Sequence, residues 1–139
     1  MNRFVLDASV GLAWFIDKPQ PRFAAEIRAR LSAGARAAVP SLWHLEMGNG
    51  FALAQRRGAF TSVETDQYLV EIESLLVTCI DTEAELPPIR EVVRSAISLQ
   101  LSAYDAVYLK LAQSLALPLA TLDRDLQRAA TKTGVPLVS

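Results

Sequence analysis

Short apolar segments alternate with amphipathic segments along this chain, and the alternation constrains the fold more than any other feature. Apolar runs with the length of strands occupy residues 4–6, 37–40, 75–80 and 118–122, and a proline-containing run at 135–138 has the character of an edge strand. Runs with helical periodicity lie between them, at residues 10–16, 22–33, 42–57, 61–76, 89–98, 102–112 and 126–133. This order predicts an α/β fold, in which helices flank a central, mostly parallel sheet of four to five strands.

The composition predicts one soluble domain over residues 1–139. Hydrophobic residues make up 51% of the 139 positions, enough for a sizeable core. The single cysteine, Cys79, and the single histidine, His44, exclude an intrachain disulfide and a structural zinc site of four nitrogen or sulfur ligands. The first apolar run stops at Asp7, too early for a signal peptide, and no run has the length of a membrane helix. We therefore expect a cytoplasmic protein without membrane segments.

Two aspartates directly follow predicted strands. Asp7 comes after residues 4–6, and Asp123 comes after residues 118–122. Ligands of open α/β sheets bind beyond the carboxyl ends of the strands. If the first and fourth strands are neighbours, Asp7 and Asp123 face each other there. The alternative is that Asp7 and Ser9 only cap the following helix, since both residue types are favoured N-caps.

Glu46 lies within the predicted helix over residues 42–57, and the helix offers two faces. One stripe combines Glu46 with other residues at helical spacing, namely Leu42, Leu45, Asn49 and Leu53. An inward carboxylate on that stripe is costly unless it is paired or bound to a cation. A rival apolar face is formed by Trp43, Met47 and Phe51, and in that case Glu46 lies at its edge.

Asp105 lies in the first turn of the predicted helix that begins at Ser102. Ser102 and Asp105 have the spacing of a capping box, with Asp in place of Glu or Gln, so helix capping alone could explain both residues. Thr61 and Glu64 have the true capping-box spacing at the start of an earlier helix. Adjacent parallel strands and helix N-termini share one edge of the sheet, where Asp105 and Glu46 could join Asp7 and Asp123.

Several carboxylates in one cleft predict a cation site. Like charges at close range raise each other's pKa or require a cation. Oxygen ligands without histidine or cysteine favour Mg²⁺ or Mn²⁺, and ions of this kind support in-line attack on a phosphodiester. The sequence offers no Ser–His or Cys–His pair as a competing nucleophile and no glycine-rich phosphate loop.

Four motifs taken together resemble the PIN-domain ribonucleases, specifically VapC-type toxins of type II toxin–antitoxin systems. The motifs are Phe4–Ser9, Pro40 followed by Glu46, Ser102–Tyr108 and Ala120–Leu126. The resemblance implies a PIN-like three-layer α/β/α fold and a Mg²⁺- or Mn²⁺-dependent endoribonuclease. It also implies a homodimer whose site is masked by a cognate antitoxin. Ala8 departs from the threonine that many relatives carry.

By the same resemblance, individual residues acquire roles. Asp7, Glu46, Asp105 and Asp123 match the acidic catalytic and metal-binding positions. The fourth acidic position varies in the family, so Asp125 is an alternative metal ligand to Asp123. Ser9 and Thr121 match hydroxyl positions that support the site.

A different class of function stays open at this stage. The net charge is −1 and no basic patch stands out, which favours a catalytically silent PIN-like module that binds a partner protein. Four arginines are candidate RNA contacts if the chain is a nuclease: Arg22, Arg28, Arg56 and Arg57. A haloacid-dehalogenase-like phosphatase is disfavoured, because Ser9 stands where its second aspartate is expected.

Overall fold

Four parallel strands form the sheet of this protein, for which a computed structural model describes residues 2–139. The strands are β1 (Arg3–Leu6), β2 (Arg36–Pro40), β3 (Ile80–Glu83) and β4 (Leu119–Ala120), in the order β3-β2-β1-β4. β1 lies at the centre and pairs with β4, with Leu6 opposite Ala120. The predicted α/β class is confirmed, and so is the neighbourhood of the first and fourth strands.

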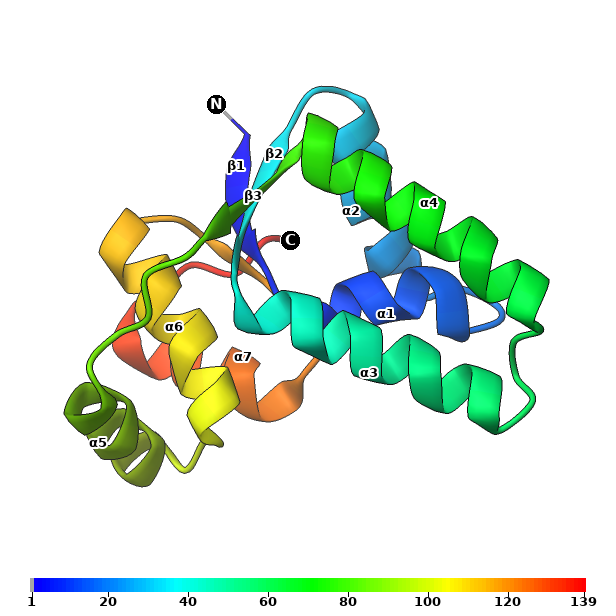
Figure 1. Ribbon diagram of the computed structural model, residues 1–139. Coiled ribbons are helices and arrows are strands. Elements are labelled where there is room, and N and C mark those ends of the chain that lie inside the picture. Colours follow the sequence, from blue (N-terminus) through cyan, green and yellow to red (C-terminus); the bar gives the residue numbers. More distant parts are fainter. Residues whose placement is uncertain (1) are drawn as a thin grey trace.

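Helices cover both faces of this sheet. Figure 1 shows α1 to α4 gathered on one side of the strands and α5 to α7 on the other, which gives three layers. Within residues 2–139 the seven helices are α1 (Ala8–Ile16), α2 (Arg22–Ser32), α3 (Leu42–Arg56), α4 (Ser62–Thr78), α5 (Ile89–Leu99), α6 (Ala103–Leu115) and α7 (Arg124–Thr133). Because both faces are covered, the central strands are buried throughout: Phe4 to Leu6 and Ala37 to Val39 are all in the core.

The rival face of α3 is the buried one. Trp43, Met47 and Phe51 enter the core, whereas Leu45 is 74% exposed and Asn49 is exposed. The stripe containing Leu45 and Asn49 therefore does not face inward. Two large aromatic rings and a methionine remove more apolar surface from water than the leucines of that stripe. Glu46 consequently lies at the border of the buried face and is half-buried.

The predicted third strand was placed too early. Residues 75–78 continue α4, and the helical hydrogen bonding extends to the N–H of Cys79, which donates to the Leu75 carbonyl at 2.9 Å. β3 begins only at Ile80, so Asp81 and Thr82 lie inside the strand that they were expected to end. An unbroken apolar run is equally typical of a strand and of the end of a helix. The predicted capping box of α4 is present: the Glu64 N–H donates to Thr61 Oγ1, and the Thr61 N–H donates to Glu64 Oε1.

The predicted fifth strand reduces to one bridge within residues 2–139. Leu137 forms an isolated parallel bridge with Leu119, and no further ladder follows. Pro136 has no N–H with which to continue the ladder. The sheet therefore has four strands.

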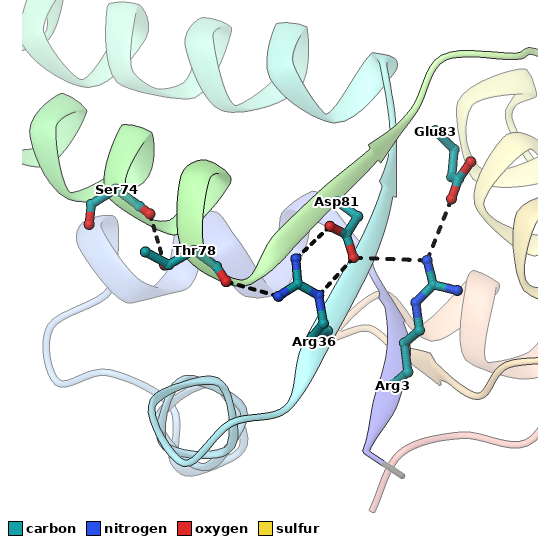
Figure 2. A network of polar contacts seen from close by, with 6 residues as sticks. All are labelled: Arg3, Arg36, Ser74, Thr78, Asp81 and Glu83. Carbon is teal, nitrogen blue, oxygen red and sulfur yellow. Dashed lines mark hydrogen bonds and ion pairs between the residues drawn. The ribbon is translucent and has the colours of Figure 1, made fainter.

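Charged side chains join β1, β2 and β3, from the beginnings of β1 and β2 to Glu83 at the end of β3. Figure 2 shows Arg36 holding Asp81 with two hydrogen bonds, of 2.7 and 3.1 Å, and donating a third to the Thr78 carbonyl. Arg3 reaches Glu83 at 3.5 Å in the same network. The Arg36 guanidinium lowers the pKa of the Asp81 carboxyl. These contacts link β2 to β3. The candidate site residues described below lie outside this network.

Candidate active site

Asp7 is a buried carboxylate held by two hydroxyl groups. It follows β1 directly and is only 4% exposed. Ser9 Oγ donates to Asp7 Oδ2 at 2.6 Å, and Thr121 Oγ1 donates to the same oxygen at 2.8 Å. Asp7 occupies the N-cap position of α1, but its side chain forms no capping hydrogen bond. Capping therefore does not explain the carboxylate.

Thr121 connects this carboxylate to the end of β4. Its hydroxyl donates to Asp7 and accepts from the N–H of Asp123 at 3.0 Å. Gln127 Nε2, on α7, donates to the Thr121 carbonyl at 3.0 Å. Both the side chain and the backbone of Thr121 are thus fixed. Sequence reasoning missed Gln127, whose only signal is its position one turn into α7.

Asp123 begins α7 beside Asp7. Its Oδ1 accepts from the N–H of Leu126 at 2.9 Å, so it caps the helix. The N–H of Leu122 donates to Ser9 Oγ at 3.0 Å, which ties this turn to the turn after β1. The predicted proximity of Asp7 and Asp123 follows from this pair of turns.

Glu46 and Asp105 come from helices on opposite layers. Glu46 lies on α3, and its Oε1 accepts a hydrogen bond of 2.7 Å from the hydroxyl of Tyr108 on α6. Asp105 lies one turn before Tyr108 and is half-buried. The N-cap of α6 is Ser102, whose Oγ accepts from the Asp105 N–H at 3.0 Å. Tyr108 ends the motif Ser102–Tyr108, but the sequence predicted no role for it. Its spacing from Asp105 puts both residues on one side of α6.

The four acids interact electrostatically. Burial, which is the largest cause, and the charges of Asp123, Asp7 and Glu46 together raise the pKa of the Asp105 carboxyl to about 6. Burial also raises the pKa of Asp7, with a contribution from Asp123 and against the effect of its two hydroxyl donors. The pKa of Glu46 is raised by burial and by Asp7, and is lowered by the donor Tyr108. No lysine or arginine is among the causes of these three shifts, so the site carries uncompensated negative charge.

The donor set fits a hard divalent cation in charge and in atom type. All candidate ligands are carboxylate oxygens, and a cation would relieve their repulsion. Within residues 2–139, no three or more Asp, Glu, His or Cys side chains already converge into a ready ligand group. Mg²⁺ does not need such a group, because it usually keeps several waters and binds through one or two carboxylates.

Asp125 lies apart from this set. Its Oδ1 pairs with Arg128 Nη1 at 2.7 Å on the surface of α7, and it contributes to none of the shifts described above. Of the two candidates for the fourth acidic position, the structure brings Asp123 to the other acids and leaves Asp125 outside.

The candidate RNA-contact arginines are not part of the acidic set. Arg28 pairs with Glu71 at 3.3 Å, and its guanidinium lies 5.2 Å from the centroid of the Trp14 ring. The remaining three are exposed on α2 and at the end of α3: Arg22, Arg56 and Arg57.

A cavity of about 540 Å³ lies elsewhere, between the segment before α5 and the outer side of α6. Its lining includes Glu85, Glu91 and Lys110 and none of the candidate site residues. The acidic residues of the candidate site therefore lie at the edge of the sheet and not in this cavity. Among residues 2–139, no helix has the length and apolar character needed to cross a bilayer.

A parallel α/β sheet with acidic residues beyond the carboxyl ends of its strands places the chain among the α/β folds that bind their ligands at this edge. The profile of the PIN domain family matches residues 4–132, and the chain belongs to this family. PIN domains are generally nucleases, so the chain falls into the nuclease class of hydrolases.

A solved structure has a similar fold. The chain is similar to a protein described as "Crystal structure of PAE2754 from Pyrobaculum aerophilum", with 26% identity and a TM-score of 0.67. The match covers 92% of this chain and 79% of that chain. No curated protein matches the sequence.

Proposed function

We propose that this protein is a divalent-metal-dependent endoribonuclease that acts as the VapC-type toxin of a toxin–antitoxin pair. The observation that carries the proposal is the set of four mutually repelling carboxylates at one edge of the sheet in a PIN domain. Asp7, Glu46, Asp105 and Asp123 would hold Mg²⁺ or Mn²⁺. Ser9 and Thr121 support the set through Asp7. RNA in the cytoplasm is the proposed substrate.

The ion, when bound, would supply an activated water and stabilise charge on the leaving oxygen of a phosphodiester. The residues of the chain prepare the site for it. Two hydroxyl donors keep the buried Asp7 oriented and favour its ionised form. Asp105 takes up a proton near pH 6 when the site holds no cation, so cation binding there must displace that proton at lower pH.

The test is RNA cleavage by the purified protein with Mg²⁺ or Mn²⁺, and with EDTA. Asp123→Asn should lose at least about 100-fold in rate, because it removes a charge from the acidic set. Asp125→Asn is the matched control, two residues away and paired on the surface, and should cleave like the wild type. Equal cleavage by Asp123→Asn and the wild type would contradict the assignment of this residue.

A cognate antitoxin and a second copy of the chain are the proposed partners. The support is the family resemblance, together with large apolar side chains that remain exposed on several helices: Leu45, Val70, Val77, Ile89 and Ile97. Single apolar residues are common on surfaces, whereas two on one helix, as on α4 and on α5, favour an interface. Sedimentation at micromolar concentration should show a dimer, and a monomer would count against it.

The second candidate function is a catalytically silent module that binds a partner protein. The lack of a ready group of metal ligands in the described chain favours it. Calorimetric titration with Mn²⁺ separates the two functions. Binding that is lost in Asp7→Asn supports the nuclease, and no binding at millimolar Mn²⁺ supports the silent module.

A further inference from the structure

Tyr108 is fully buried on α6, and its hydroxyl hydrogen bonds to a member of the acidic set. It donates to Glu46 Oε1 at 2.7 Å across the gap between α6 and α3, from a position 62 residues later in the chain. A buried phenol requires a polar partner. Here the partner is a half-buried carboxylate, so this hydrogen bond fixes an acidic side chain as well as the tyrosine.

The same hydroxyl lies close to the other acids. Asp105 precedes Tyr108 by three residues on α6, so the two residues share one side of the helix. Asp7 also acts on this hydroxyl, because its negative charge raises the pKa of Tyr108. One hydroxyl therefore contacts the side chain of Glu46 on α3, and it belongs to the helix that carries Asp105.

The phenol remains a donor at every working pH. Burial, the hydrogen bond to Glu46 and the negative charges of Glu46 and Asp7 raise the pKa of Tyr108 above its ordinary value near 10. Ionisation of Tyr108 would place another negative charge among the carboxylates. Tyr108 consequently keeps its proton and donates it in the hydrogen bond to Glu46.

We propose that Tyr108 is a positioning residue that orients Glu46 for a divalent cation. By occupying Oε1, it restricts the rotamers of Glu46 and leaves Oε2 as the oxygen that can meet the cation. The inference rests on the proposed metal-dependent function and extends it to a residue outside the acidic set. Partners that orient metal-binding carboxylates commonly change metal affinity by about 10–100-fold when they are removed.

The test is Mn²⁺ binding by calorimetry, with no RNA present. Tyr108→Phe removes one oxygen and keeps the ring, and it should weaken Mn²⁺ binding by about 10-fold. The matched control is Tyr104→Phe on the same helix, where the side chain is 61% exposed, and its affinity should equal that of the wild type. Circular dichroism and thermal unfolding establish that both variants are folded.

A double-mutant cycle shows whether Tyr108 acts through Glu46. Glu46→Gln should itself weaken Mn²⁺ binding, and adding Tyr108→Phe to it should cause little further loss. A wild-type affinity in Tyr108→Phe would overturn the inference while leaving the metal site of the proposed function intact. A wild-type affinity in Glu46→Gln would overturn the inference and would also remove Glu46 from that site. If the wild type binds no Mn²⁺, the proposed function fails and the inference fails with it. Because Glu46→Gln is an independent variant, the inference remains testable even if Tyr108→Phe does not fold.

Discussion

At the scale of single residues, the acidic set depends on neutral donors. Asp7 is buried next to Thr121 and Ser9, and its charge is compensated only by hydroxyl groups among the contacts described above. Burying an ionised carboxylate is unfavourable unless hydrogen bonds or a cation compensate it. Because the hydroxyl groups are neutral, they leave negative charge that the proposed cation would balance. A lysine or arginine at the same place would have balanced that charge itself.

The pKa of Asp105 gives a prediction for the metal-free protein. Its ordinary value of 3.8 applies to the unfolded chain, and folding raises it to about 6. The native state binds this proton more tightly than the unfolded state, so the contribution of Asp105 to stability is lost as the pH rises from about 4 through about 6.

Asp105→Asn should accordingly stabilise the protein relative to the wild type at neutral pH. Allowing for solvent screening of a half-exposed group, we expect a gain of about 1 kcal/mol near pH 7 and a smaller one near pH 5. Urea unfolding in EDTA measures both values. Asp125→Asn, on the surface of α7, is the control, and its gain near pH 7 should be smaller than that of Asp105→Asn. A gain for Asp105→Asn that is independent of pH would argue against repulsion within the set.

The candidate site was predicted most directly where residues adjoin strands, whereas Glu46 and Asp105 were added through the positions of their helices and the family resemblance. Asp7 and Asp123 directly follow short apolar runs, so parallel pairing was enough to bring them together. Tyr108 carries no such signal, because a tyrosine in an apolar helix reads as a core residue. Its role depends on Glu46, which lies on a different helix and in the opposite layer. Periodicity within one helix contains no information about that partner.

At the scale of elements, the open choice at α3 and the error at the end of α4 came from segments with two plausible interpretations. α3 offered two apolar stripes, and only packing against α1 and the sheet decides between them. The apolar run at the end of α4 has strand-like composition, yet the helix that begins at the Thr61 capping box continues through it. Helices with one clear stripe and a clear cap, such as α7 before Gly134, were placed within a few residues.

Two glycines test the contact between α1 and α3. An added Cβ at Gly48 would meet nothing within 4 Å, so Gly48→Ala should stabilise α3 by about 1 kcal/mol through helix propensity. At Gly11, on α1, it would lie 3.0 Å from Met47 Sδ and 3.2 Å from Trp43 Cζ2. Gly11→Ala should therefore destabilise the protein by about 1–3 kcal/mol through overpacking.

Thermal or urea unfolding of the two variants measures the difference. The informative quantity is the sign, because both substitutions place alanine inside a helix. Stabilisation by both would show that Met47 and Trp43 can move aside, and that the approach of α1 to α3 is loose.

At the scale of the whole molecule, we propose that residues 1–139 form a single cooperative domain. One sheet contacts helices of both layers, through α6 on β1 and β2 and through α3 on β2. Trp14 and Trp43 lie on α1 and α3 and report on one layer, whereas circular dichroism reports on helices of both. The two signals should give coincident urea transitions. A fluorescence change that precedes the loss of helix would divide the protein into separately unfolding layers.

The pairing of β1 with β4 has a consequence for the protein during its translation. Asp7 is translated early, but Thr121 and Asp123, which complete its surroundings, come from the last strand and the turn after it. A chain still in synthesis holds the first acid of the site without its hydroxyl from Thr121 or its acidic neighbour. The acidic set of this nuclease fold is therefore incomplete until residues 119–123 have been made.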